Sequence, residues 1–270
     1  MTAGKKKIGC IGAGNMGGAI LSRLAAGADP HAISVYDAAP GKAEALAHGT
    51  GIAVAKSPED CARSSEIMII AVKPDAVAAA LNSIKGSVAD GAVIVSIAAG
   101  ITIAAMEKVL GRSMKIVRVM PNTPAMVGEG MSVLSPNGAV DDNALLDVER
   151  IFSRIGRVIV LPEKLMDAVT GLSGSGPAYV FTFIQALADG GVKLGIPRDK
   201  ALVLAAQTVM GSAKYLLESG EDPMALRGKV TSPGGTTIEG IHVLERSGFS
   251  GIVMDAVEKA AQKSEKLGEK

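Results

Sequence analysis

The sequence of 270 residues has no tryptophan, only three tyrosines and only four phenylalanines. It therefore offers few platforms on which the bases of a single-stranded nucleic acid could stack. An excess of one charge is also lacking, because the net charge is +1 and the pI is near 7.7. Proteins that neutralise many backbone phosphates carry a clear excess of Lys and Arg. We therefore expect no nucleic-acid partner.

Cysteine and histidine are scarce as well. Cys10 and Cys61 form no CxxC or Cys/His spacing, and His31, His48 and His242 are isolated from one another. This pattern excludes a disulfide framework and a zinc site, so we expect no metal and a reducing, cytoplasmic compartment. It also leaves no Ser/His/Asp or Cys/His combination for nucleophilic catalysis.

No apolar stretch is long enough to cross a bilayer, although the mean hydropathy is +0.32. The uncharged segment Gly91–Met106 falls short of the roughly 18 residues that a span needs, and it contains Ser96 and Thr102. The basic N-terminal residues 1–7 precede a glycine-rich turn and lack the apolar core of a signal peptide. We expect neither a membrane association nor a signal peptide.

Glycine, by contrast, is abundant, with 33 of 270 residues or about 12%, against a usual share of about 7%. Up to about Leu161, short aliphatic runs alternate with Ala-rich amphipathic segments. The runs are apolar almost throughout, as in a parallel sheet covered on both faces. This alternation predicts an α/β fold, a doubly wound parallel sheet of the Rossmann type. The strands are expected at Ile8–Ile11, Ile33–Tyr36, Ile67–Val72, Ala92–Ile97 and Ile116–Met120, with two weaker ones at Met131–Leu134 and Val158–Leu161.

After Pro162 the pattern predicts helices only. The sequence thus divides into a dinucleotide-binding domain at 1–162 and an all-α C-terminal domain at 163–270. The segment Pro177–Leu194 is apolar nearly all round, so it must be enclosed on every side. A domain of this size could hardly enclose it alone, and we infer that a second subunit helps, which makes 163–270 a dimerisation domain. A simple central core helix is the alternative.

The clearest motif is the G-x-G-x-x-G of Gly12, Gly14 and Gly17, which follows the first predicted strand and opens a helix. The first glycine permits the tight turn, the second lets the backbone approach a pyrophosphate, and the third allows close helix–strand packing. Asp37, twenty residues past Gly17, ends the second predicted strand, where a carboxylate can bind the ribose hydroxyls of NAD and would repel a 2′-phosphate. A glycine turn without a ligand, and an Asp37 that only caps the next helix, remain open.

Three further loops follow predicted strands: Ala71–Pro74, Ser96–Gly100 and Met120–Pro124. Ligands of open α/β sheets bind outside the carboxyl ends of the strands, so the first two loops are expected to line the dinucleotide site. The third, with two prolines around Asn122 and Thr123, suits the nicotinamide end, although Thr123 could equally belong to a structural turn.

The helical half contains a second candidate site. The turn Ser232–Thr237 precedes a predicted helix and offers backbone N–H groups and hydroxyls without a positive charge, which suits a small carboxylate. A simple helix cap is the alternative. No residue stands out as a strong acid or base, whereas a carbonyl reductase normally needs a proton shuttle. A cyclic imine is basic enough to arrive protonated, so the sequence favours imine reduction.

Six segments together resemble the Δ1-pyrroline-5-carboxylate reductase family. They are Gly9–Gly17, Ala71–Pro74, Ser96–Gly100, Met120–Pro124, Ser173–Tyr179 and Val230–Thr237. They run in the family's order over essentially the whole chain, and the last of them is the family's signature.

The resemblance implies reduction of 1-pyrroline-5-carboxylate to L-proline by NADPH or NADH, the last step of proline biosynthesis. It also implies a homodimer through the helical domain, often within a ring of dimers. The expected cofactor-binding residues are Ile11, Gly12, Ala13, Gly14, Asn15, Met16, Gly17, Asp37, Ala71, Val72, Lys73, Pro74, Ile97, Ala98 and Ala99. The expected substrate-binding residues are Glu163, Ser232, Gly234, Gly235, Thr236 and Thr237, with Thr237 as the catalytic hydrogen-bond donor to the ring nitrogen. The family mostly favours NADPH, but Asp37 and Ala38 stand where it often has small polar residues.

Two alternatives remain. A β-hydroxyacid dehydrogenase has a similar two-domain plan, but Val180 stands where its catalytic lysine would lie. A dinucleotide-binding regulator without turnover is the other, and such a protein would not need the second small-anion site at Ser232–Thr237.

Overall fold

The computed structural model describes residues 6–27 and 29–268. Most of the basic N-terminal stretch, for which no signal peptide is expected, lies outside the described residues. The chain forms two compact units: unit 1 is Met1–Ser175 with Lys259–Lys270, and unit 2 is Gly176–Glu258. This division differs from the predicted boundary between 162 and 163, because Met166 and Val169 pack against Val133 of the sheet.

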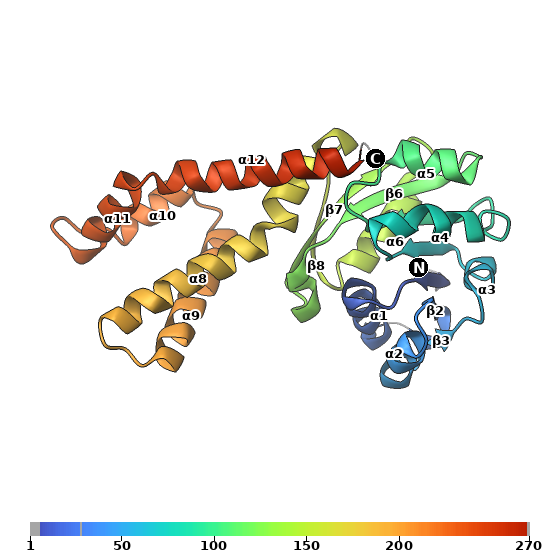
Figure 1. Ribbon diagram of the computed structural model, residues 1–270, viewed down its shortest axis with the longest axis horizontal. Coiled ribbons are helices and arrows are strands. Elements are labelled where there is room, and N and C mark those ends of the chain that lie inside the picture. Colours follow the sequence, from blue (N-terminus) through green and yellow to red (C-terminus); the bar gives the residue numbers. More distant parts are fainter. Residues whose placement is uncertain (1–5, 28, 269–270) are drawn as a thin grey trace. The chain divides into compact units, whose positions relative to one another are not determined.

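Unit 1 contains an eight-stranded sheet in the order β3-β2-β1-β4-β5-β6-β7-β8 (Figure 1). The strands are β1 Ile8–Ile11, β2 Ile33–Tyr36, β3 Ala53–Val54, β4 Ile67–Ile70, β5 Val93–Ser96, β6 Lys115–Met120, β7 Gly130–Pro136 and β8 Gly156–Val160. From β3 to β6 all neighbours are parallel, and β1, β4 and β5 are buried along their whole length. The continuous apolar runs therefore correspond to strands covered on both faces.

One pair of strands departs from the predicted parallel arrangement. β7 runs antiparallel to β6, while β8 is parallel to β7. Parallel neighbours need a crossover of about a dozen residues or more. The link from Met120 to Gly130 is shorter than that and holds only a 3₁₀ helix at Thr123–Val127, so the chain can return only antiparallel.

Helices cover both faces of the sheet, which confirms the doubly wound α/β fold (Figure 1). One core lies under α1 Asn15–Gly27, α2 Lys42–Thr50 and α6 Asp142–Phe152. The other lies under α3 Pro58–Arg63, α4 Val77–Ile84 and α5 Ile103–Leu110. The short elements β3 and α3 were not predicted, because Ala53–Val54 is too brief to show a strand pattern.

The local chemistry of the chain sets where several helices begin and end. The side chains of Ser57, Thr102 and Asp141 accept the backbone N–H three residues further on, which caps the first turns of α3, α5 and α6. Gly111 ends α5 in the left-handed conformation that glycine adopts without strain. After α7 Met166–Val169, the glycine-containing segment Thr170–Gly174 is π-helical.

Unit 2 is helical, as predicted. It comprises α8 Gly176–Lys193, α9 Arg198–Ser219, α10 Pro223–Lys229 and α11 Thr236–Arg246, together with the first half of α12 Phe249–Gly268. Helices α8 and α9 lie side by side (Figure 1), with Ala188, Ala201 and Ala205 buried between them. None of the described helices is long and apolar enough to span a membrane.

Candidate functional site

The glycine turn between β1 and α1 has the geometry that its motif requires. The Gly12 N–H donates to the Tyr36 carbonyl at 2.8 Å, and Gly12 has a φ of +109°, which side-chain-bearing residues rarely adopt. A Cβ at Gly12 would lie 2.4 Å from the Ala71 carbonyl oxygen. Only glycine therefore fits where the chain turns beside the neighbouring strand.

The other two glycines of the motif differ from each other in their surroundings. A Cβ at Gly17 would lie 2.2 Å from the Gly12 carbonyl oxygen, so the start of α1 packs directly on the turn. A Cβ at Gly14 would meet no atom within 4 Å. Gly14 thus keeps one side of the turn open, as the approach of a pyrophosphate to the N-terminus of α1 requires.

A cavity of about 280 Å³ opens beside this turn. It lies at the carboxyl ends of β1 and β2, next to β4, where the strand order of the sheet reverses. Ligands of open α/β sheets bind at this topological switch point. The cavity is lined by Ile11, Gly12, Tyr36, Asp37, Ala38, Pro58, Val72, Ala76, Ala79, Ala80 and Ser83.

Asp37 is the acidic residue of this cavity, and its carboxylate is fixed by the backbone. Oδ2 accepts the Ala13 N–H at 2.7 Å, and Oδ1 accepts the Ala39 N–H at 2.8 Å. Each carboxylate oxygen can accept a second hydrogen bond, so Asp37 can still accept hydrogen bonds from two ribose hydroxyls. Because the lining contains no Lys, Arg or His, nothing there would neutralise a 2′-phosphate beside this carboxylate.

The loops after β4 and β5 extend the same edge of the sheet. The Ala71 N–H donates to Ile11 and the Ile97 N–H to the Ile70 carbonyl, at 2.8 and 3.1 Å. Ala98 is buried, whereas Lys73 and Pro74 are exposed. The structure therefore brings the predicted cofactor loops to one edge, and their role in binding stays a prediction.

Asn122 has a structural role in the loop after β6. Its amide nitrogen donates to the carbonyl and the hydroxyl oxygens of Ser173 at 3.2 and 3.3 Å, and its Oδ1 accepts the Met131 N–H at 2.8 Å. Thr123 begins the 3₁₀ helix that follows. Gly174 lies nearby, and a Cβ there would come within 2.5 Å of Met120 Cε, so the methionine side chain would have to shift.

Glu163 lies at the start of a 3₁₀ turn at Glu163–Leu165, within unit 1. Its Oε1 accepts the Ile103 N–H at the start of α5, at 2.7 Å, and a guanidinium N–H of Arg118 at 3.2 Å. The side chain remains 31% exposed. Its predicted role with the substrate is compatible with this partly open position and stays a prediction.

The turn at Ser232–Thr237 lies in unit 2 at the start of α11. Pro233 and Gly234 occupy its centre, Gly234 has a φ of +67°, and the Gly235 N–H donates to the Ser232 carbonyl at 3.0 Å. Proline followed by a glycine with positive φ is typical of a type II turn. Gly235, the N-cap residue of α11, has no side chain with which to cap the helix. The first N–H groups of α11 therefore stay available to an anion.

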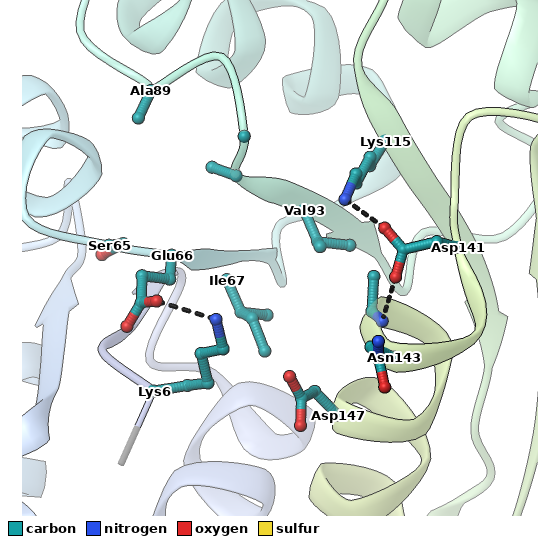
Figure 2. Close-up of a pocket in the computed structure, with 13 residues that line it drawn as sticks. Lys6, Ser65, Glu66, Ile67, Ala89, Val93, Lys115, Asp141, Asn143 and Asp147 are labelled. Carbon is teal, nitrogen blue, oxygen red and sulfur yellow. Dashed lines mark hydrogen bonds and ion pairs between the residues drawn. The ribbon is translucent and has the colours of Figure 1, made fainter. Parts of the chain in front are cut away.

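The opposite, amino-terminal edge of the sheet has a hollow of about 340 Å³ (Figure 2). Four of its charged groups pair with one another: Lys6 Nζ lies 2.8 Å from Glu66 Oε1, and Lys115 pairs with Asp141. Asp147, the fifth, lies 3.3 Å from Arg150 outside the hollow. These pairs explain why the pKa of Lys6 is raised and that of Asp141 lowered. Because each of these charges already has a partner of opposite sign, this hollow has little to offer a charged ligand.

The described residues contain neither a reactive thiol nor a cluster of side chains that could hold a metal ion. Cys10 and Cys61 are free and buried, and burial raises the pKa of both thiols, so they stay protonated and unreactive. Nowhere between residues 6 and 268, residue 28 aside, do three His, Cys, Asp or Glu side chains gather in a way that could hold a metal ion.

The sheet order, the glycine turn at the switch point and the fixed Asp37 define a Rossmann-type dinucleotide-binding protein. The comparisons with known proteins are more specific. The family profile for pyrroline-5-carboxylate reductase dimerisation matches residues 163–267, and that for NADP oxidoreductase, coenzyme F420-dependent, matches residues 7–100.

Known relatives match along nearly the whole chain. The pyrroline-5-carboxylate reductase of Escherichia coli is 47% identical over 97% of this chain and 98% of its own. The structure of a pyrroline-5-carboxylate reductase from Coxiella burnetii matches with a TM-score of 0.93 at 34% identity, over 97% and 98% of the two chains. The Plasmodium falciparum pyrroline carboxylate reductase, solved with NADP bound, matches with a TM-score of 0.87 at 36% identity, over 97% and 98%. The chain belongs to the pyrroline-5-carboxylate reductase family.

Sequence reasoning missed part of the site. It did not anticipate that Tyr36, Pro58 and Ser83 line the cavity, because they come from separate elements and form no motif. Arg118 was not predicted as a site residue either. Its position within the apolar run of β6 is a sequence signal for a buried, paired charge.

Proposed function

We propose that this protein is a pyrroline-5-carboxylate reductase, which reduces 1-pyrroline-5-carboxylate to L-proline with a reduced nicotinamide coenzyme as the last step of proline biosynthesis. The observation that supports this proposal most is the match to reductases of that name along nearly the whole chain. The glycine turn of this chain, open at Gly14, lies at the switch point of the sheet, where a dinucleotide binds. Within this proposal, residues 1–162 bind the coenzyme and residues 163–270 bind the substrate and the second subunit.

The reaction requires few catalytic groups from the protein. When bound, the reduced nicotinamide supplies a hydride. The imine carbon of the substrate gains that hydride, the C=N electron pair moves to nitrogen, and nitrogen retains or takes up a proton while the coenzyme is oxidised. Orientation of the imine supplies most of the catalysis, which fits a chain without a histidine shuttle.

The residues of this chain then have distinct tasks. We assign the substrate carboxylate to the turn at Ser232, Gly234 and Gly235, where the N-terminus of α11 provides N–H groups and a favourable dipole. Thr236 and Thr237 add hydroxyls on the first turn of the helix, and Thr237 hydrogen-bonds the ring nitrogen. Glu163 is a further residue that we assign to the substrate.

Asp37 points to NADH as the preferred coenzyme of this chain. Its carboxylate is held by two backbone N–H groups in a cavity without cationic side chains, so the 2′-phosphate of NADPH would meet an unbalanced negative charge. Replacing Asp37 with serine is expected to lower the Kd for NADPH about tenfold or more, because a like-charge contact is removed. Isothermal titration with both coenzymes measures this, with Asp90→Ser at the opposite edge as the control. An unchanged ratio of the two Kd values would exclude Asp37 as the selector.

The proposal includes a homodimer formed through the helical domain. Unit 2 exposes large apolar side chains, among them Phe181 on α8, Leu194 in the turn after α8 and Leu204 on α9. An exposed apolar surface of this kind marks an interface between proteins. We also propose a cytoplasmic location, with which two free, buried cysteines are compatible.

The test is an assay of the purified protein. NADH and NADPH oxidation is followed with 1-pyrroline-5-carboxylate and, separately, with the semialdehyde that is the oxidised form of 3-hydroxyisobutyrate. Oxidation with the imine alone supports the proposal. Turnover of the semialdehyde would favour a β-hydroxyacid dehydrogenase, and coenzyme binding without any turnover would favour a regulator.

The role of Thr237 is tested separately. Thr237→Ala is expected to lower kcat several-fold without unfolding the protein, because the hydrogen bond to the ring nitrogen is lost. Thr208→Ala in α9, whose hydroxyl donates to the Leu204 carbonyl, is the matched control. Equal kinetics of the two variants would remove Thr237 from the mechanism and leave the family assignment in place.

A further inference from the structure

Arg118 is the one charged side chain that is buried among the described residues, at 4% exposure. It lies on β6, between the apolar Val117 and Val119, two residues before the strand ends. Its backbone partner in the neighbouring strand is Ser96, the last residue of β5. A charge is costly to bury unless it is paired, so the role of Arg118 can be inferred from the groups with which it pairs.

Two carboxylates surround the guanidinium. One of its N–H groups donates to Glu163 Oε1 at 3.2 Å, and the other terminal nitrogen lies 3.8 Å from Asp167 Oδ1. The hydroxyl of Ser264, on the part of α12 that belongs to unit 1, donates to the same Asp167 oxygen at 2.6 Å. Asp167, which Ser264 holds in turn, is thus the second and more distant partner of the arginine, and the side chains of Glu163 and Asp167 are 31% and 28% exposed.

The contacts of Glu163 are asymmetric. Oε1 accepts two hydrogen bonds, from Arg118 and from the Ile103 N–H, which opens the helix after the loop Ile97–Ala99. Oε2 has no hydrogen-bond partner within the described part of the chain, and the side chain is 31% exposed. One oxygen is therefore fixed, and the other can accept a hydrogen bond from a ligand.

We propose that Arg118 is a positioning residue for the substrate. It fixes Glu163 so that the second carboxylate oxygen accepts a hydrogen bond from the protonated ring nitrogen of the cyclic imine. Thr237 then donates to the lone pair that this nitrogen gains when the hydride adds to carbon. Arg118 itself does not touch the substrate. This inference rests on the proposed function, and it adds that a buried guanidinium orients the carboxylate on which recognition of the ring depends.

The planar fork of an arginine fixes a carboxylate in a way that the single ammonium of lysine does not. Arg118→Lys keeps the charge and removes the fork. We expect kcat/KM for 1-pyrroline-5-carboxylate to fall about 10- to 100-fold, the range for losing a hydrogen bond to a charged group. The Kd for NADH, measured by isothermal titration, is expected to stay within about twofold, since Arg118 lies outside the coenzyme cavity. Arg150→Lys, in an exposed ion pair with Asp147, is the control.

A double-mutant cycle separates positioning from general support of the fold. If Arg118 acts through Glu163, Arg118→Lys changes kcat/KM by less than about twofold in a Glu163→Gln background. An equal loss in both backgrounds, or a parallel loss of NADH binding, overturns the proposal. Unchanged kcat/KM in Arg118→Lys overturns it as well. Wild-type protein that binds NADH but does not reduce the imine would instead refute the proposed function.

Unfolding of the variant is monitored separately, because removing a buried charge from its partners is destabilising. Thermal melting of Arg118→Lys and Asp167→Asn identifies any loss of folded protein. Asp167→Asn keeps the contact between Arg118 and Glu163, so its kcat/KM is expected to fall less than that of Arg118→Lys. The reverse order would show that the arginine serves Asp167 and α12, and would refute the positioning of Glu163.

Discussion

In unit 1 many large apolar side chains are enclosed, Phe152 and Leu81 among them, whereas in unit 2 Phe181 is 65% and Leu194 86% exposed. Unit 1 has two extended cores, one on each face of its sheet. Among the described residues, unit 2 has a buried cluster of only three alanines with flanking Ile184 and Val192. Unit 1 therefore carries its own core, while unit 2 needs a second surface to bury its apolar residues.

The strongest test of this contrast removes a side chain from the core of unit 1. Phe152→Ala leaves a cavity under α6 and is expected to lower the free energy of unfolding by about 3 to 5 kcal/mol. Urea denaturation measures this loss, which should not depend on protein concentration, because the core lies within one chain. A loss below about 1 kcal/mol would mean that unit 1 tolerates a large cavity, contrary to its close packing.

The corresponding test of unit 2 introduces a charge on its apolar surface. Phe181→Glu is expected to raise the dissociation constant of the dimer about 100-fold or more, because a buried phenylalanine contributes roughly 1.5 to 3 kcal/mol and the new charge must be desolvated. Sedimentation equilibrium measures the dimer. Leu146→Glu on α6, an exposed leucine of unit 1, is the control and should leave the dimer intact. Equal dissociation by both variants would place the interface elsewhere.

Substitutions of surface charges are expected to show the smallest difference in stability between the two units. In unit 2, Asp189 accepts hydrogen bonds from Arg198 and Gln185, at 2.8 and 3.0 Å, and these contacts hold its pKa below the usual value. In unit 1, Lys6 and the Lys7 N–H lower the pKa of Glu66 in the same way. A lowered pKa in the folded state gives stability above the ordinary carboxyl pKa, and this stability is lost as the pH falls through the folded-state pKa.

We therefore expect Asp189→Asn and Glu66→Gln to lower the melting temperature slightly near pH 7 and to differ less from the wild type near pH 3. Both pairs are exposed and screened by solvent, so the effects should be small in both units. Melting curves at the two pH values provide the check. A large effect for Asp189 alone would show that this carboxylate is buried in the dimer.

Much of the fold could be predicted because it depends on local patterns. The apolar runs of β1, β4 and β5 and the capped helix α5 are encoded by neighbouring residues. The same holds for the glycine turn, since the spacing of Gly12 and Gly17 expresses a steric need that the structure shows directly. The antiparallel direction of β7 next to β6 was not predicted, because strand direction depends on the length of the connection as well as on the strand pattern.

The candidate site was predictable only where it is made of contiguous residues. The turn at Ser232–Thr237 could be read from the sequence, because proline and two glycines specify its backbone. The lining of the coenzyme cavity by Tyr36 and Ser83 could not, since these residues come from different elements.

The sequence alone determined the sheet's core strands, the helical second half and the two glycine turns, because short-range sterics and the periodicity of apolar residues specify each of them. Only the tertiary structure decided that Asp37 is fixed by the backbone of Ala13 and Ala39 and that Arg118 binds Glu163. Those contacts join residues up to 45 positions apart. Hydrogen-bond geometry over such separations is set by the packing of strands and helices, which no local pattern specifies.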